Sequence, residues 1–92
     1  MSIRPMFDFD EVHKNAGLAA IEATQAMEKW PPMNSAHEGY AVLLEEVDEL
    51  WEHVRMNQKK RDLVAMKKEA LQVAAMALRF ATEICNEERG RK

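Results

Sequence analysis

Residues 35–54 have the sequence SAHEGYAVLLEEVDELWEHV, and this stretch decides the fold. Ser35 and Glu38 form a capping box, in which each side chain accepts an amide hydrogen at a helix start. The pattern predicts a helix from there to about residue 55 or 56. Its apolar stripe has amphipathic spacing and comprises Tyr40, Leu43, Leu44, Val47, Leu50, Trp51 and Val54. The opposite side carries the carboxylates Glu38, Glu45, Glu46, Glu49 and Glu52.

An earlier helix is predicted over about residues 10–29. Asp8 and Asp10 are candidate N-caps, and Pro31 and Pro32 end the helix because neither can donate a helical hydrogen bond. A seam of mostly small residues follows steps of three and four, through Val12, Ala16, Ala19, Ala23, Ala26 and Trp30. The alanines predict that a neighbouring backbone comes close.

A third helix is predicted over about residues 62–87, after a short polar break that favours an antiparallel return. It is apolar almost all round between residues 70 and 81, so a second subunit is expected to cover part of it. Its polar seam comprises Lys68, Glu69, Gln72, Arg79 and Glu83. We therefore expect an all-α fold in which three helices form a four-helix-type bundle completed by dimerisation or higher assembly. One domain would span residues 1–92, with a core of about 10–88.

Composition narrows the class of protein. The 92 residues are 47% hydrophobic with a formal net charge of −3, which disfavours nucleic acid as a partner. The apolar run 73–78 is too short to span a bilayer. The single cysteine, Cys85, placed within the third helix, excludes an intramolecular disulfide. With no signal peptide recognisable in the first twenty residues, we expect a cytoplasmic protein without membrane contact.

The candidate site is the acidic face of the middle helix. Glu45, Glu46 and Glu49 lie three and four residues apart, where like charges repel by roughly 0.2–0.5 kcal/mol per pair. Glu69 and Gln72 would bring oxygen ligands from the facing helix, an arrangement that bundles use for metals. Mg²⁺ takes such hard ligands together with waters and phosphates. The alternative is a solvated acidic face, the more frequent origin of such charge patterns.

These residues resemble a known family. Glu45-Glu46-x-x-Glu49, then nineteen residues, then Glu69-x-x-Gln72 is similar to the E-E-x-x-E…E-x-x-D pattern of the MazG-like, all-α nucleoside triphosphate pyrophosphohydrolases. The sequence segments around this pattern, HEGY at 37–40 and EALQVAA at 69–75, resemble a small branch of that superfamily in phages and bacteria. The resemblance covers about residues 35–81.

The resemblance implies hydrolysis of a nucleoside triphosphate, or a related nucleotide, to the monophosphate and pyrophosphate. It implies Mg²⁺, with Mn²⁺ as a substitute, held by Glu46, Glu49, Glu69 and the residue at position 72. Glu45 would be a further ligand or would orient the attacking water. Position 72 departs from the pattern, because an amide oxygen can coordinate Mg²⁺ but supplies no charge. The runner-up hypothesis is therefore a non-catalytic helical oligomer that binds nucleotide or metal.

Other residues carry weaker expectations. Lys68 and Arg79 flank the acidic seam and either contact phosphate oxygens or pair with glutamates. Trp30 and Trp51 could stack on a base, but packing in the core or a subunit interface is favoured. His37 and His53 are expected in capping or surface roles. 

Overall fold

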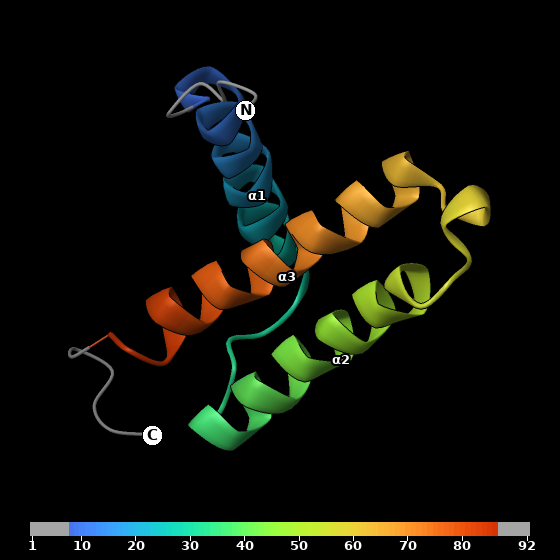
Figure 1. The fold of residues 1–92 in the computed structure, drawn as a ribbon. Coiled ribbons are helices and arrows are strands. Elements are labelled where there is room, and N and C mark those ends of the chain that lie inside the picture. The colour runs from blue at the N-terminus through green and yellow to red at the C-terminus, as the bar shows by residue number, and fades with distance from the viewer. Residues whose placement is uncertain (1–7, 87–92) are drawn as a thin grey trace.

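The computed structural model describes residues 8–86, which form three α-helices and one short 3-10 helix, with no strand in that range (Figure 1). The elements are α1 (Phe9–Lys29), α2 (Ala36–Val54), η1 (Gln58–Lys60) and α3 (Leu63–Glu83). The expected all-α class is thereby confirmed. No helix among the described residues is both long enough and apolar enough to cross a membrane.

Side-chain caps fix where the helices begin. Asp8 caps α1, Ser35 caps α2 and Asp62 caps α3, each by accepting amide hydrogens of the first turn. Ser35 Oγ accepts from the Glu38 amide at 3.1 Å, as the capping box predicts. The Glu38 carboxylate reaches one residue further back than expected and accepts from the Asn34 amide at 3.2 Å.

α3 ends earlier than the sequence suggested. Its last residue is Glu83, and the predicted end at residue 87 lies outside the described residues. The amides of Ile84 and Cys85 both donate to the Phe80 carbonyl, at 2.9 and 3.3 Å, so the regular hydrogen-bond ladder stops there. Cys85 therefore follows the helix, exposed, instead of lying within it.

α3 is the helix on which the other two pack (Figure 1). α2 returns antiparallel to it, as predicted, and α1 crosses it. The close approach expected from the alanine seam is confirmed at the crossing, where Ala19, Ala23 and Ala75 are buried. Val12 and Trp30, at the two ends of that seam, remain exposed, so α1 uses only the middle of its seam for this contact.

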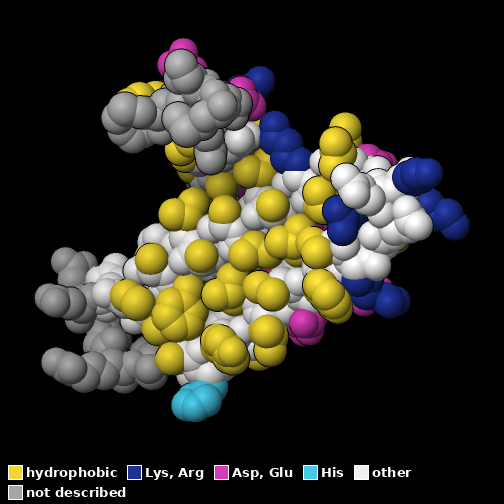
Figure 2. Space-filling view, in the orientation of Figure 1, with side chains coloured by type: hydrophobic (Ala, Val, Ile, Leu, Met, Phe, Trp, Pro, Cys, Tyr) yellow, Lys and Arg dark blue, Asp and Glu magenta, His cyan; other side chains and the backbone are white. Residues whose placement is uncertain are grey.

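Only part of the apolar stripe of α2 packs against the core, at Leu43, while most of the stripe is exposed. Gly39, Val42 and Glu46 lie on the contact side, with Gly39 buried and Val42 packed against the core. The exposed members of the stripe are Tyr40, Leu44, Val47, Trp51 and Val54. Ala77, Leu78 and Ala81 of α3 are exposed as well, and Figure 2 shows a broad hydrophobic surface over these two helices.

The contact of α2 with α3 depends on the absence of a side chain at Gly39. A Cβ built there would lie 2.7 Å from Phe80 Cδ2 and 3.0 Å from Met33 Sδ. Gly39→Ala should therefore lower the free energy of unfolding by about 1–3 kcal/mol, because overpacking outweighs the helix propensity of alanine. Urea unfolding followed by circular dichroism measures the change.

Gly17 of α1 provides the matched control, since a Cβ there would meet no atom within 4 Å. Gly17→Ala should raise the free energy of unfolding by roughly 0.5–1 kcal/mol. Equal effects of the two substitutions would contradict the packing described for Gly39.

Candidate functional site

Three carboxylates meet between α2 and α3. Glu46 and Glu49 come from α2 and Glu69 from α3, and each offers an oxygen that lies within 4.8 Å of those of the other two. Glu46 and Glu69 are half-buried, whereas Glu49 is exposed. The antiparallel return places Glu69 opposite the α2 pair, as the helix periodicity and the short break predicted. Whether these residues bind a metal stays a prediction.

The environment of Glu46 disfavours its charged form. Its pKa is raised to about 7, most of all by burial, and then by the charge of Glu49, a hydrogen bond with Glu49 and the charges of Glu69 and Glu45. Within the described residues, no cation is paired with this cluster. A proton on Glu46 lowers the repulsion within the cluster when no cation is bound.

Glu69 also has an unsatisfied carboxylate oxygen. Its Oε2 atom is buried and has no hydrogen-bond partner in the described part of the chain. Buried polar atoms without a partner are rare and costly. An orphaned carboxylate oxygen beside two further carboxylates fits a divalent cation with oxygen ligands, which is the chemistry of Mg²⁺ or Mn²⁺.

A cleft of about 640 Å³ shares Glu46 with this cluster, whereas Glu49 and Glu69 do not line it. Glu45 and Glu46 lie on its α2 wall, and Gln72, Met76 and Arg79 lie on its α3 wall. The remaining wall comes from α1 and the linker between α1 and α2, with Glu22, Gln25, Ala26, Lys29, Trp30, Pro31 and Met33. Its size falls within the range of small-molecule sites.

Gln72 has a partner that the sequence did not reveal. Its Nε2 atom donates to Glu22 Oε2 of α1 at 3.0 Å. Glu22 lies three residues after Ala19 and four before Ala26, so it borders the alanine seam that packs on α3. That spacing was the available signal for a third carboxylate-bearing helix at the cleft.

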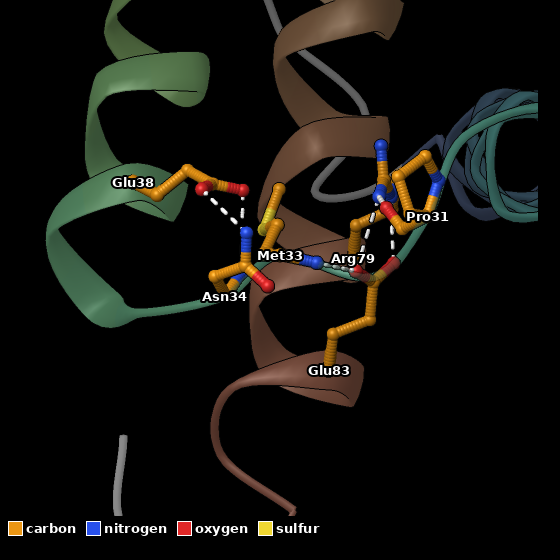
Figure 3. A network of polar contacts seen from close by, with 6 residues as sticks. All are labelled: Pro31, Met33, Asn34, Glu38, Arg79 and Glu83. Atoms are coloured by element: carbon orange, nitrogen blue, oxygen red, sulfur yellow. Dashed lines mark hydrogen bonds and ion pairs between the residues drawn. The ribbon is translucent and has the colours of Figure 1, made fainter.

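The two expected substrate-binding cations lie in different places. Lys68 is exposed on α3 and does not line the cleft. Arg79 lines it but is only 4% exposed, and its guanidinium is bound to Glu83 and to the Pro31 carbonyl (Figure 3). The sequence predicts that Arg79 either contacts phosphate oxygens or pairs with a glutamate, and the structure shows the pairing with a glutamate.

The aromatic and histidine candidates are distributed as follows. Trp30 lines the cleft, with Lys29 Nζ 5.4 Å from its ring centroid, whereas Trp51 is exposed on the apolar stripe of α2. Trp30 is 56% exposed, so the single chain gives it no core position. His37 is exposed, and His53 is half-buried with no hydrogen-bond partner for Nδ1 in the described chain.

Comparison of the chain with protein-family models, with curated proteins and with solved structures finds no match in any of the three.

The raised pKa of Glu46 predicts how the stability of the metal-free protein depends on pH. The folded state binds the proton more tightly than the unfolded chain, so this stabilisation is complete below pH 4.5 and is lost as the pH rises through about 7. Glu46→Gln should remove this component and leave the protein more stable than the parent chain at about pH 8. Urea unfolding in EDTA across the pH range measures it.

Glu52→Gln is the control, because Glu52 lies on the exposed side of α2 and pairs with Arg55 at 3.0 Å. It should keep the pH dependence of the parent chain. If Glu46→Gln also kept that dependence, Glu46 would not be the group responsible.

Proposed function

We propose that this chain is a Mg²⁺-dependent nucleotide pyrophosphohydrolase of MazG-like type. It hydrolyses a nucleoside triphosphate, or a related nucleotide, to the monophosphate and pyrophosphate. One water is consumed as the anhydride bond between the α- and β-phosphates breaks. The observation that carries the proposal is the meeting of Glu46, Glu49 and Glu69 between α2 and α3, with Glu46 also lining the cleft.

Glu46, Glu49 and Glu69 are the residues that would hold the cation. When bound, Mg²⁺ or Mn²⁺ supplies positive charge that polarises a phosphate and lowers the pKa of a coordinated water. Glu45 belongs to the α2 wall of the cleft and is exposed. Its carboxylate can accept a hydrogen bond from the attacking water and orient it.

The charge of the cleft supports a role for cations in substrate binding. Four carboxylates line it, those of Glu22, Glu38, Glu45 and Glu46, against the cations Lys29 and Arg79. Arg79 is already neutralised by Glu83. A polyphosphate entering this cleft alone would be repelled, so divalent cations must accompany it.

One observation favours the alternative, a non-catalytic helical oligomer that binds nucleotide or metal. The Gln72 amide group donates to Glu22, and as a neutral ligand it adds no charge to the binding of a cation. Weaker cation affinity than in a site with aspartate at this position is expected in both hypotheses. Measured turnover of a nucleotide distinguishes the enzymatic hypothesis from the non-catalytic one.

Dimerisation, or higher assembly, is part of the proposal. The exposed stripe of α2 and the exposed alanines and Leu78 of α3 form a hydrophobic surface that one chain leaves uncovered (Figure 2). Tyr40 and Trp51 on this surface are 62% and 56% exposed. A large exposed apolar patch marks an interaction site, and a second copy packed there would complete a four-helix bundle.

The reaction is tested with purified protein, Mg²⁺ or Mn²⁺, and a panel of standard and modified nucleoside triphosphates. Monophosphate and pyrophosphate should appear in equal amounts. Glu49→Gln should lower kcat by about a hundredfold or more, with the circular dichroism spectrum retained, because it removes a charged ligand. No turnover of any nucleotide by the parent protein would refute the enzymatic proposal and leave the non-catalytic alternative.

The assembly is tested by Leu44→Lys, which places a charge in the apolar stripe of α2. Sedimentation should show a dimer or larger species for the parent chain at micromolar concentration and a shift toward monomer for the variant. Glu28→Lys, on an exposed position of α1, is the control and should leave the assembly intact. A stable folded monomer of the parent chain would contradict this part of the proposal.

A further inference from the structure

The end of the cleft remote from the carboxylate cluster is built around a buried ion pair. Arg79 and Glu83 are 4% and 7% exposed, and they lie one turn apart on α3. Arg79 Nε donates to Glu83 Oε2 at 2.6 Å, and Nη2 donates to Glu83 Oε1 at 3.0 Å. This two-point contact is the strongest geometry available to a guanidinium and a carboxylate.

The pair also holds the linker between α1 and α2. Arg79 Nη2 donates to the Pro31 carbonyl at 3.2 Å, and the Met33 amide donates to Glu83 Oε1 at 2.7 Å (Figure 3). Pro31, Met33 and Arg79 all line the cleft. Glu83 does not line it, but it contacts Met33 and Arg79 directly and is connected to Pro31 through Arg79.

One guanidinium nitrogen is left over. Nε and Nη2 are occupied, whereas Nη1 makes no hydrogen bond with the described residues and points away from Glu83 in Figure 3. Nη1 is not among the buried side-chain atoms that lack a partner, so it is accessible from the cleft. Arg79 can therefore donate from Nη1 to a ligand in the cleft.

The pairing of Arg79 with Glu83 changes the kind of ligand group that Nη1 of Arg79 favours. A free arginine attracts phosphate by its charge, but the pair of Arg79 with Glu83 is neutral overall and attracts a third charged group less strongly. Arg79 also lies ten residues beyond Glu69 on α3, which is about 15 Å along the helix. The charged end of a nucleotide belongs at the carboxylate cluster with its cation, so the group at Arg79 is an uncharged part of the molecule.

We propose that Glu83 is a positioning residue for nucleoside selectivity. It fixes Arg79 and the Pro31–Met33 linker so that Nη1 donates to an uncharged oxygen of the nucleoside, either a base carbonyl or a sugar oxygen. This inference rests on the proposed function, because it assumes that a nucleotide occupies the cleft.

The test compares the parent protein with Glu83→Gln and with Arg79→Lys. Kinetic constants are measured for uridine, cytidine, guanosine and adenosine triphosphates in ribose and deoxyribose forms, and Mn²⁺ affinity is measured separately. Both variants should raise KM about tenfold for the preferred nucleotide, as expected for one lost hydrogen bond, with kcat changed less than about twofold. Mn²⁺ affinity should not change. Arg79→Lys keeps a cation beside Glu83, so it carries the test if Glu83→Gln does not fold.

The panel distinguishes the two oxygen sources. A KM penalty confined to nucleotides with a base carbonyl assigns the contact to the base, because adenine has no carbonyl. A penalty that depends on the sugar, whatever the base, assigns it to the sugar. Glu52→Gln, which disrupts an exposed ion pair of α2, should leave every constant unchanged.

Two results would overturn the inference. KM values unchanged in both variants would show that Arg79 makes no selective contact. A parallel loss of kcat, nucleotide affinity and Mn²⁺ affinity for all substrates would show a structural role only. If the parent protein neither turns over nor binds any nucleotide by calorimetry, the proposed function fails and this inference fails with it. Failure of the inference alone leaves the parent protein active.

Discussion

Repulsion between carboxylates at the contact of α2 and α3 is the constraint that the arrangement of the chain has to accommodate. An amphipathic helix ordinarily turns its apolar stripe toward its neighbour and its acids toward water. α2 instead turns Glu46 toward Glu69 and leaves Tyr40 and Trp51 outside. The consequence is visible in the raised pKa of Glu46 and in the orphaned oxygen of Glu69. Such violations of polar satisfaction concentrate at functional sites.

α3 also buries the ion pair of Arg79 and Glu83. The buried charges of these two residues are therefore paired, unlike those of the carboxylate cluster. Arg79 and Glu83 are more deeply buried than Glu46, but each is matched by the other and by the linker backbone. A buried charge with a complete set of partners is tolerated, whereas one without partners must be protonated or bind a cation. The cleft thus has a compensated end and an uncompensated end. A nucleotide with its divalent cation has the same polarity, since its charge is confined to the phosphates.

Local signals predicted the helices and half of the site. Ser35, and Asp8 as one of two candidates, could be recognised as caps because that role depends only on the next few residues. Glu69 could be placed opposite Glu46 because the break between α2 and α3 is short. The contact face of α2 could not be predicted, because the apolar stripe indicates a buried face without saying whether α3 or a second chain covers it. The spacing of Glu22 indicates that it borders the alanine seam, but its pairing with Gln72 depends on how α1 crosses α3. The contacts of Glu83 depend on the path of the linker, which no sequence spacing specifies.

The amide at position 72 is best understood together with Glu22. A carboxylate at position 72 would lie at hydrogen-bonding distance from the Glu22 carboxylate and add one more repulsive pair to a cleft that already holds four acids. Glutamine replaces that repulsion with a hydrogen bond at 3.0 Å to the Glu22 carboxylate, which lines the same cleft. The carboxylate at this point of the cleft therefore comes from α1. This exchange makes the electrostatics of the site depend on how α1 crosses α3, and hence on the buried contact of Ala19 and Ala23 with α3.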